Sequence, residues 1–416
     1  MTMKKLLKNA RIVEKGNPLN GQTLDVLIEG GEIVEIAEQI NAEGAQVIAS
    51  DQLYVSPGFF DLHVRACDPG FEHKEDLLSV TQAAKAGGFT GICLSPNTLP
   101  VADSKSHIQY ITAANKTSEI ELFAVGALSE KMKGENICEM YDMHQSGAVA
   151  FSDEKKSIQN ADLLRRALLY TKDFGGLVMN FPTDESIAQN GMMNEGIKST
   201  RTGLKGIPAL AEELTISRDL FIAEYCEAPI HFSTITTRKS VELIRNAKAK
   251  GLNVTCDVAI HNLVYTDNAL TDFDTHFKTN PPLRTQEDVD ALTEGIKDGT
   301  IDAITSDHMP ENIENKACEF DYAAFGISSL ETAFSLAVEH LESKIGLEKL
   351  IHCFSNGPRE ILRLSQPTIS VGAKANLTCF DTTLDAVYSA DTWNSKSQNN
   401  PEIGHTLKGS ILEVIV

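Results

Sequence analysis

Apolar and polar residues alternate with a period of two at both ends of the chain. Near the N-terminus, the segments 6–13, 23–36 and 45–49 show this pattern, and Gly30-Gly31 within 23–36 predicts a hairpin. The segments 375–381 and 405–416 repeat it near the C-terminus. We expect these distant ends to join into one small β-sandwich domain formed by residues 1–57 and 366–416.

The intervening residues 58–365 show a different pattern, in which short apolar runs alternate with amphipathic helical segments. Several helical segments end in glycine, as helix C-termini prefer. The expected strands after PGFFDLHV are FTGICLSP, IELFAVGA, GAVAFSD, GLVMNFP, APIHFSTI, NVTCDVAI and IDAITSD, and the expected helices lie at 75–87, 160–175, 216–227, 239–251 and 287–299. This repetition favours a (β/α)8 barrel, with a doubly wound open sheet as the alternative.

Polar residues gather where the expected strands end, which is where a barrel of this type carries its chemistry. Each is also explained, taken alone, as a hydrogen-bonded polar residue at a strand end. Imidazole and carboxylate groups converging from several strands are what a hydrolytic metal site needs. The residues in question are His63, Asn97, Asp153, Asn180, His231, His261 and Asp307.

Composition excludes several classes of binding partner and predicts the cellular compartment. The 416 residues are 42% hydrophobic and carry a net charge of −21, which argues against binding to nucleic acid or to an acidic membrane surface. No apolar run is long enough to predict a membrane span, and the N-terminal residues do not resemble a signal peptide. The eight cysteines form no CxxC pair, so we expect reduced thiols and a cytoplasmic protein.

The chain resembles the dihydroorotases of the amidohydrolase superfamily, in their long, hydantoinase-like form. The resemblance rests on segments that follow the family's order, among them PGFFDLHV, DPGFEHKEDL, SPNTLPVADS, KTNPPLRTQEDVDAL, DGTIDAITSDHMPE and FGISSLETAF. It implies a TIM-like barrel flanked by a β-sandwich. It also implies zinc-dependent, reversible hydrolysis of dihydroorotate to carbamoyl aspartate, a step of pyrimidine biosynthesis.

The metal-binding positions of that family are only partly matched. His-x-His on the first strand is replaced by His63-Val64-Arg65, and the arginine that grips the substrate carboxylate is replaced by Cys67. Of two further histidine ligands, one is replaced by Asn180, or by Phe181 if the alignment slips by one residue, and the other by Thr234. The resemblance assigns the bridging carboxylate to Asp153, the proton shuttle and a metal contact to Asp307, and substrate contacts to Asn97, Asn280 and His261.

These losses leave one incomplete metal set. His63, Asp153 and Asp307 remain as ligands for at most one zinc ion, whereas the second site keeps only its bridging carboxylate. Arg65 would place a fixed positive charge beside the first ion, so we expect its guanidinium to replace the metal by pairing with Asp153 or Asp307.

Two functions therefore remain open. In the first, which we favour, the chain is a catalytically impaired or inactive dihydroorotase-like protein that acts as a structural partner of aspartate transcarbamoylase. In the second, it is an active dihydroorotase or related cyclic amidohydrolase with a single metal. The resemblance also implies a homodimer.

Overall fold

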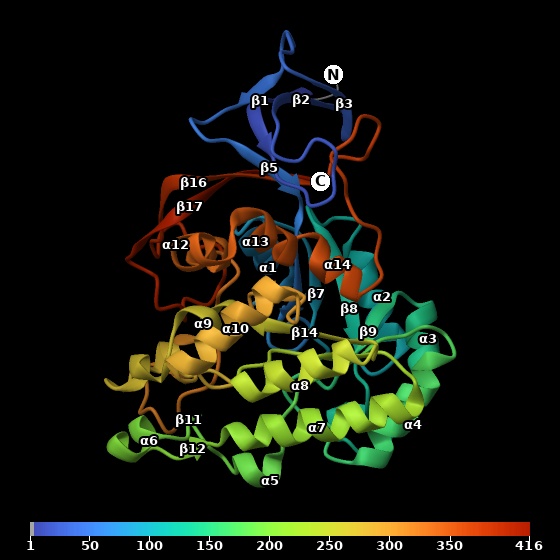
Figure 1. The fold of residues 1–416 in the computed structure, drawn as a ribbon, viewed down its shortest axis with the longest axis vertical. Helices are drawn as coiled ribbons and strands as arrows, with labels where there is room; N and C mark the ends of the chain where they lie inside the picture. Colours follow the sequence, from blue (N-terminus) through green and yellow to red (C-terminus); the bar gives the residue numbers. More distant parts are fainter. Residues whose placement is uncertain (1–3) are drawn as a thin grey trace.

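The two ends of the chain meet in one seven-stranded sheet. The computed structural model describes residues 4–416, and Figure 1 shows this sheet at one end of the molecule. Its strand order is β17-β16-β5-β1-β2-β3, and β4 pairs with β1. The strands are β1 (Lys4–Ile12), β2 (Thr23–Glu29), β3 (Glu32–Ala37), β4 (Gln46–Ile48), β5 (Tyr54–Pro57), β16 (Leu377–Val387) and β17 (Thr406–Ile415).

The period-two pattern gives this sheet a core of its own. Leu7, Val26, Val55 and Leu377 are buried together, so strands from both termini contribute to one apolar cluster. The expected union of both chain ends is thus confirmed, as a single hydrogen-bonded sheet. The division of the chain at residues 57 and 366 stays a prediction.

The middle of the chain forms an eight-stranded parallel sheet in the order β15-β14-β13-β10-β9-β8-β7-β6. This confirms the expected barrel over the doubly wound alternative, and all eight expected strands are present. They are β6 (Phe59–Val64), β7 (Phe89–Leu94), β8 (Glu121–Gly126), β9 (Ala148–Phe151), β10 (Val178–Asn180), β13 (Ile230–Phe232), β14 (Val254–Ala259) and β15 (Ala303–Thr305).

The barrel closes between its first and last strands. Val64 on β6 forms a parallel bridge with His308, which follows β15. The buried carboxylate of Asp61 accepts hydrogen bonds from Thr305 Oγ1 at 2.5 Å and from the Ser306 amide at 2.7 Å. Asp61 therefore helps to close the barrel, because it holds the segment that carries His63 against the segment that carries Asp307.

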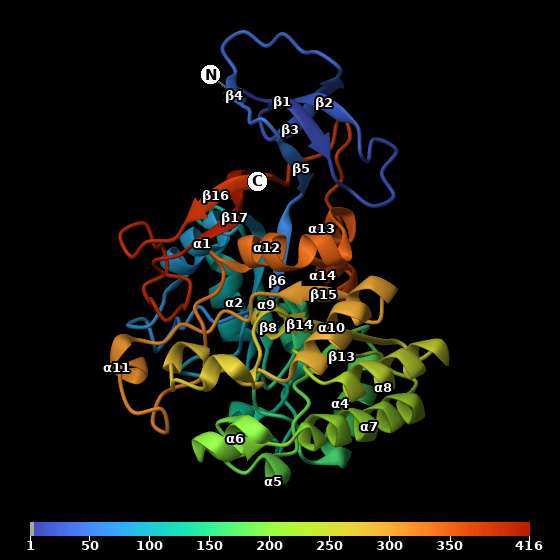
Figure 2. The same cartoon turned by 60° about the vertical axis from the view of Figure 1, so that its left-hand side comes forward.

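Helices surround the barrel, as Figures 1 and 2 show. The helix at 209–226 begins seven residues before the expected segment, and two others, at 105–114 and 333–345, were not among those expected. The longer helices are α1 (Leu77–Ala86), α2 (Lys105–Ala114), α4 (Ala161–Lys172), α7 (Ala209–Cys226), α8 (Arg238–Ala249), α10 (Gln286–Asp298), α12 (Ala333–Ile345) and α13 (Leu347–Phe354).

Short elements occupy the connections between them. They are α3 (Met140–Gln145), α5 (Glu185–Ala188), α6 (Ile197–Thr202), α9 (Ile260–Val264), α11 (Ile313–Lys316), α14 (Asn356–Ile361), the two-stranded sheet of β11 (Met193–Asn194) and β12 (Gly206–Ile207), and the 3-10 turns η1 (Glu130–Met132), η2 (Asp267–Leu270) and η3 (Thr275–Phe277). None of the helices in residues 4–416 is long and apolar enough to cross a membrane.

Candidate active site at the barrel mouth

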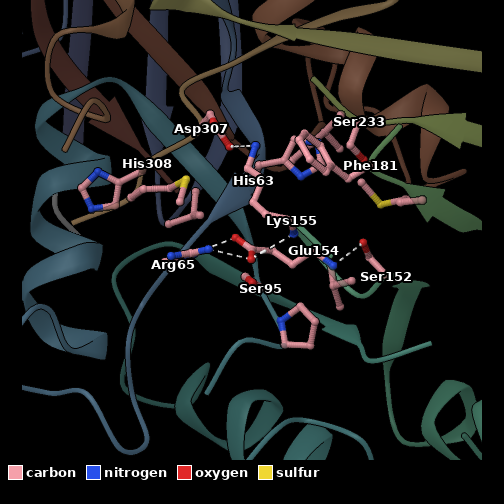
Figure 3. A pocket seen from close by; sticks show the side chains of 16 residues that line it. His63, Arg65, Ser95, Ser152, Glu154, Lys155, Phe181, Ser233, Asp307 and His308 are labelled. Atoms are coloured by element: carbon pink, nitrogen blue, oxygen red, sulfur yellow. Dashed lines mark hydrogen bonds and ion pairs between the residues drawn. The ribbon is translucent and has the colours of Figure 1, made fainter. Parts of the chain in front are cut away.

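The first barrel strand delivers two basic side chains to the mouth of the barrel. His63 and Arg65 point the same way because successive side chains of a strand alternate. Both line a cavity together with Glu154, Lys155 and Asp307. Figure 3 shows these side chains converging at the carboxyl ends of the strands, where the sequence predicted the site.

Arg65 forms a bidentate ion pair with Glu154. Its Nε and Nη2 atoms donate to the two carboxylate oxygens, each at 2.6 Å (Figure 3). Burial opposes the charged form of Glu154, but the charge and hydrogen bonds of Arg65 outweigh it and lower the pKa of Glu154. Arg65 thus pairs with neither Asp153 nor Asp307, the two partners that the sequence predicted. Glu154, the residue that follows Asp153, pairs with it instead.

A second cation lies beside the first pair. Lys155 Nζ is 2.7 Å from Asp307 Oδ1 and donates to Thr234 Oγ1 at 3.2 Å. The ammonium also lies 5.0 Å from the centre of the Phe181 ring, within cation–π distance. Asp307, the predicted proton shuttle, is thus neutralised by a lysine that the sequence prediction did not include.

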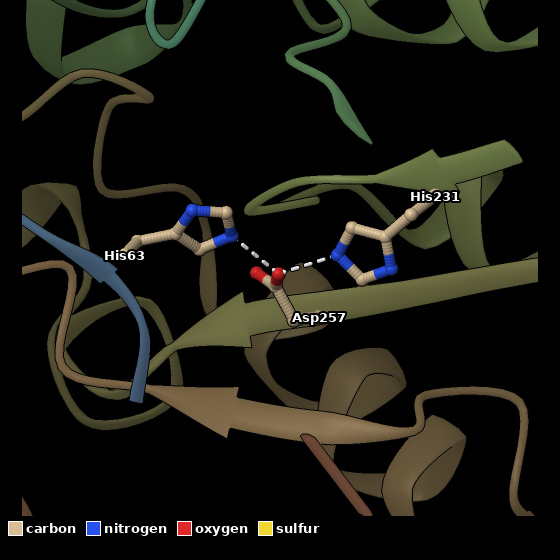
Figure 4. A group of neighbouring side chains, drawn as sticks. All are labelled: His63, His231 and Asp257. Atoms are coloured by element: carbon tan, nitrogen blue, oxygen red, sulfur yellow. Dashed lines mark hydrogen bonds and ion pairs between the residues drawn. The ribbon is translucent and has the colours of Figure 1, made fainter. Parts of the chain in front are cut away.

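Deeper in the barrel, His63 and His231 share one carboxylate oxygen (Figure 4). Their Nε2 atoms lie 2.6 Å and 2.7 Å from Asp257 Oδ2. Burial disfavours the charged form of His63, but the Asp257 carboxylate outweighs this and raises the pKa of His63. These three residues place three possible metal-ligand atoms within 4.8 Å of one another.

Two residues that the sequence assigned to the metal centre are engaged elsewhere. The Asp153 carboxylate accepts hydrogen bonds from the amides of Leu128 at 2.9 Å and Ser129 at 2.8 Å, and from the Ser129 hydroxyl. Asn180 donates to Asp219 Oδ2 at 2.6 Å, under helix α7. Neither side chain lines the cavity, so His63, Asp153 and Asp307 are not brought together as a ligand set.

The predicted substrate contacts are dispersed. His261 lies near Asp307, with 3.9 Å between Nε2 and Oδ2, and burial lowers the pKa of His261 to about 4. Asn280 lines a separate, open cleft that shares Lys155 and Phe181 with the first cavity, whereas Asn97 lines neither.

Cys67 does not replace the missing carboxylate-binding arginine. Its thiol is buried, and burial raises the pKa of the thiol to about 12, so it is protonated and unsuited to binding an anion.

The central cavity has little room for a substrate. Its volume is about 20 Å³, close to what one water molecule occupies. The open cleft beside it measures about 570 Å³, and the Lys155 and Phe181 side chains line both the cleft and the central cavity.

Three residues of the mouth have unusual backbone conformations. Glu154, Thr234 and Asp307 have φ values of 55°, 51° and 51°, in the left-handed region that residues other than glycine rarely adopt. Such strain persists where the surroundings enforce it, and it is concentrated at functional sites. The mouth thus combines backbone conformations typical of functional sites with side chains that form internal ion pairs.

Known proteins share this architecture over the full chain. A family model described as dihydro-orotase-like matches residues 52–240. A dihydroorotase of Geobacter metallireducens is 40% identical over 417 residues, covering 100% of this chain and 98% of the relative. A dihydroorotase of Acetivibrio thermocellus is 40% identical over 414 residues, covering 99% and 97%. The chain belongs to the dihydroorotase family.

Solved structures agree on the fold. The L-hydantoinase (dihydropyrimidinase) of Arthrobacter aurescens superposes with a TM-score of 0.86 at 21% identity, covering 99% of this chain and 94% of that one. The D-hydantoinase of a Thermus species gives a TM-score of 0.80 at 19% identity. These similarities establish the TIM-like barrel of a dihydroorotase-family member.

Sequence reasoning missed three residues of this dihydroorotase-family site. Glu154 and Lys155 directly follow the segment GAVAFSD, and their charges were a signal that the cation at Arg65 had a nearby partner. Asp257 is an isolated acidic residue inside the apolar run NVTCDVAI, which is unusual in a buried barrel strand. Asking which charges must be paired inside the barrel draws attention to these residues, but it does not decide whether Asp153 or Glu154 is the partner of Arg65.

Proposed function

We propose that this dihydroorotase-family protein has lost the hydrolytic reaction, or retains only a trace of it, and serves pyrimidine biosynthesis as a structural partner of aspartate transcarbamoylase in the cytoplasm. One observation carries the loss of catalysis. The carboxylates of Glu154 and Asp307, which face the space where hydrolysis would occur, are both bound by cationic side chains of the same chain.

The residues present do not fit the metal that the family resemblance implies. A zinc site needs three or four protein ligands that are free to bind the ion. Glu154 is held at both oxygens by Arg65, Asp307 is held by Lys155, and Asp153 accepts three hydrogen bonds outside the cavity. A zinc ion would have to displace two cations and reorient Asp153.

A single-metal enzyme is the second candidate, because His63, His231 and Asp257 bring possible ligand atoms close together. Zinc–ligand bonds of about 2.0–2.2 Å at tetrahedral angles separate the ligand atoms by about 3.3–3.6 Å. The observed separations of 2.6 and 2.7 Å are those of hydrogen bonds, so both imidazoles donate to Asp257. Binding an ion here would require both rings to lose their Nε2 protons and move apart.

The structural role rests on the resemblance and on the preserved architecture. The barrel, its closure through Asp61 and the terminal sheet are all formed, whereas the catalytic equipment is internally neutralised. A protein that has kept its fold without its reaction is suited to assembling with the preceding enzyme of a pathway. Purified aspartate transcarbamoylase from the same source is the partner to test.

Metal content of the purified, untagged chain tests the loss of catalysis. After dialysis against trace zinc, elemental analysis should find less than about a tenth of an equivalent per chain, and dihydroorotate turnover should be absent. The Geobacter metallireducens dihydroorotase, treated identically, is the positive control. A stoichiometric zinc ion that is lost in a His231→Ala variant, together with dihydroorotate turnover, would establish the single-metal alternative.

The partnership needs a separate measurement. Sedimentation of the chain mixed with aspartate transcarbamoylase should show a complex larger than either component. A mixture that sediments as two independent species at micromolar concentrations would rule out this partnership, and it would leave the metal result unaffected.

A further inference from the structure

A groove lies between the terminal sheet and the barrel, away from the candidate active site. Its walls include the β1–β2 loop with Glu14 and Lys15, the start of α14, and the segment 366–371 that leads towards β16. Its volume is about 560 Å³, within the range of sites that bind small molecules. None of its lining residues lines the central cavity of the mouth, and Figures 1 and 2 show α14 beside the terminal sheet. The groove is therefore a separate candidate site.

Two opposite charges line this groove without an ion-pair partner. The Glu14 side chain is buried, and its Oε2 atom accepts hydrogen bonds from Asn17 Nδ2 at 2.6 Å and from the Ile369 amide at 2.8 Å. Within residues 4–416, no hydrogen bond reaches its Oε1 atom, and neither Glu14 nor the exposed Lys15 belongs to an ion pair. A buried carboxylate without a cation is unfavourable, so Glu14 favours the binding of a positive charge.

An unused amide lies in the same groove. Asn356, the first residue of α14, is only 9% exposed, and its Oδ1 atom is buried without a hydrogen-bond partner in the described part of the chain. Buried polar atoms of native proteins are nearly always hydrogen-bonded, so an orphaned acceptor beside a groove indicates a missing donor. Asn356 Oδ1 and Glu14 Oε1 are both acceptors, and an ammonium ion carries three N–H donors that could satisfy them.

The rest of the groove offers an apolar surface. Leu19, Leu24 and Ile36 are half-buried and pack on the core of the terminal sheet, to which Ile369 belongs. Val371 also lines the groove and is 61% exposed. Covering this surface removes apolar area from water, which favours a ligand with a branched aliphatic or aromatic body.

We propose that this groove binds a free amino acid with an apolar side chain. Glu14 Oε1 and Asn356 Oδ1 accept hydrogen bonds from its ammonium group, and Lys15 pairs with its carboxylate. A zwitterion satisfies both free charges at once, whereas an amine would leave Lys15 unpaired and an acid would leave Glu14 unpaired. Charge-assisted hydrogen bonds of this kind are the stronger ones. A residue inside a peptide chain lacks these charged groups, so the groove selects a free amino acid over a protein segment.

The bound amino acid would link two parts of the molecule. Glu14 and Lys15 belong to the terminal sheet's loop, and Asn356 belongs to a helix that follows the barrel. A ligand that binds only the folded arrangement raises the thermal unfolding temperature in proportion to the logarithm of its concentration. The proposal does not depend on whether the barrel mouth retains catalysis, and its failure would leave the metal and partner measurements unaffected.

Isothermal titration calorimetry of the full chain gives the first test. L-leucine and L-phenylalanine should each bind at one site per chain, with a dissociation constant of about 1 mM or tighter. 3-Methylbutylamine and 4-methylpentanoic acid keep the apolar body of leucine but only one of its charges, and each should bind at least about tenfold more weakly. Glycine, which keeps both charges but has no apolar body, should also bind more weakly than leucine.

Substitutions assign each charge to its partner. Lys15→Gln should weaken L-leucine binding about tenfold and leave 3-methylbutylamine binding unchanged, because the amine has no carboxylate for Lys15 to hold. Glu14→Gln should weaken the binding of both. Lys344→Gln is the matched control, because Lys344 is also exposed but lies outside the groove, and it should leave leucine binding unchanged.

A second variant covers the structural role of Glu14. Its carboxylate holds the Ile369 amide, so Glu14→Gln could loosen the segment 366–371 as well as remove the charge. Val371→Glu changes an exposed residue of the groove, so the circular dichroism spectrum should stay the same. The added charge interrupts the apolar surface, and leucine binding should fall about tenfold.

Three results would each overturn the proposal. They are the absence of binding by both amino acids at about 10 mM, 3-methylbutylamine binding as tightly as leucine, and leucine binding that Lys15→Gln leaves unchanged.

Discussion

Replacing Glu154 by glutamine isolates the ion pair that occupies the barrel mouth. The substitution keeps the shape of the side chain and removes its charge, leaving the Arg65 guanidinium without a counter-ion. Two hydrogen bonds of 2.6 Å hold the pair, and the side chains retain only 17% and 12% of their exposure. Arg65 cannot lose its proton to escape the cost, because a guanidinium keeps its proton in proteins even without a counter-ion.

The expected loss of stability follows from this geometry. Removing one partner of a buried pair costs about 3–5 kcal/mol, most of it from the charge left behind. We expect Glu154→Gln to lie at the lower end of this range, at a loss of about 3 kcal/mol. Both groups keep some exposure to solvent, and the glutamine carbonyl can still accept one hydrogen bond from Arg65. Glu227→Gln, at a carboxylate that is 85% exposed, is the matched control and should cost less than about 0.5 kcal/mol.

A double-mutant cycle measures the pair itself. Urea unfolding, followed by circular dichroism, is compared for wild type, Glu154→Gln, Arg65→Gln and the double variant. We expect a coupling energy of about 2 kcal/mol or more, with the double variant more stable than Glu154→Gln alone. Because the pKa of Glu154 is lowered, its contribution is present above the unfolded-state pKa and is lost as pH falls through the folded-state pKa. A coupling energy below about 0.5 kcal/mol would refute the reasoning that this buried pair makes a substantial contribution to stability.

Three further predictions concern neighbouring groups. Lys155→Met should cost about 2–4 kcal/mol because Asp307 loses its counter-ion, whereas Lys156→Met, at an exposed neighbouring lysine, should be nearly neutral in the same urea assay. Because the pKa of His63 is raised in the folded state, the protonated side chain stabilises the fold at pH values below its unfolded-state pKa of about 6.5, and this stabilisation is lost as pH rises through the folded-state pKa. NMR titration should show a lower His63 pKa in Asp257→Asn than in the wild type. In thiol-labelling kinetics, Cys318 should react first, because it is the one cysteine of residues 4–416 that is not buried.

The barrel was predictable because its signals are local. Each strand is an apolar run that ends in polar residues, and the closing of the barrel brings those ends together. Helix α7 was predicted only from Ile216 onwards because its first half, with Glu212 facing the barrel, lacks the usual amphipathic pattern. The first half of the helix depends on tertiary hydrogen bonds, in which Glu212 accepts from the amides of Thr236 and Thr237.

The contents of the site were predictable only in part. The replacement of metal-binding positions by Arg65, Asn180 and Thr234 could be recognised from motif order alone. The partner of Arg65 could not, since it depends on the left-handed conformation of Glu154, which turns this carboxylate into the cavity while Asp153 bonds to the β8–β9 side of the mouth. Sequence order cannot distinguish two adjacent acids when a single backbone dihedral angle decides which one faces the barrel.

Charge balance at the mouth ties these observations together. The carboxylates of Glu154 and Asp307 are each matched by one cation, Arg65 and Lys155, and the Asp257 carboxylate is hydrogen-bonded to His63 and His231. A divalent ion added to this set would lie close to two fixed positive charges in a poorly solvated space, which is unfavourable by several kcal/mol at separations of about 4 Å. Arg65→His alone would therefore not recreate a metal centre, because Lys155 would still neutralise Asp307 and Asn180 would still point towards Asp219. A metal centre at the mouth would require several of these positions to change together.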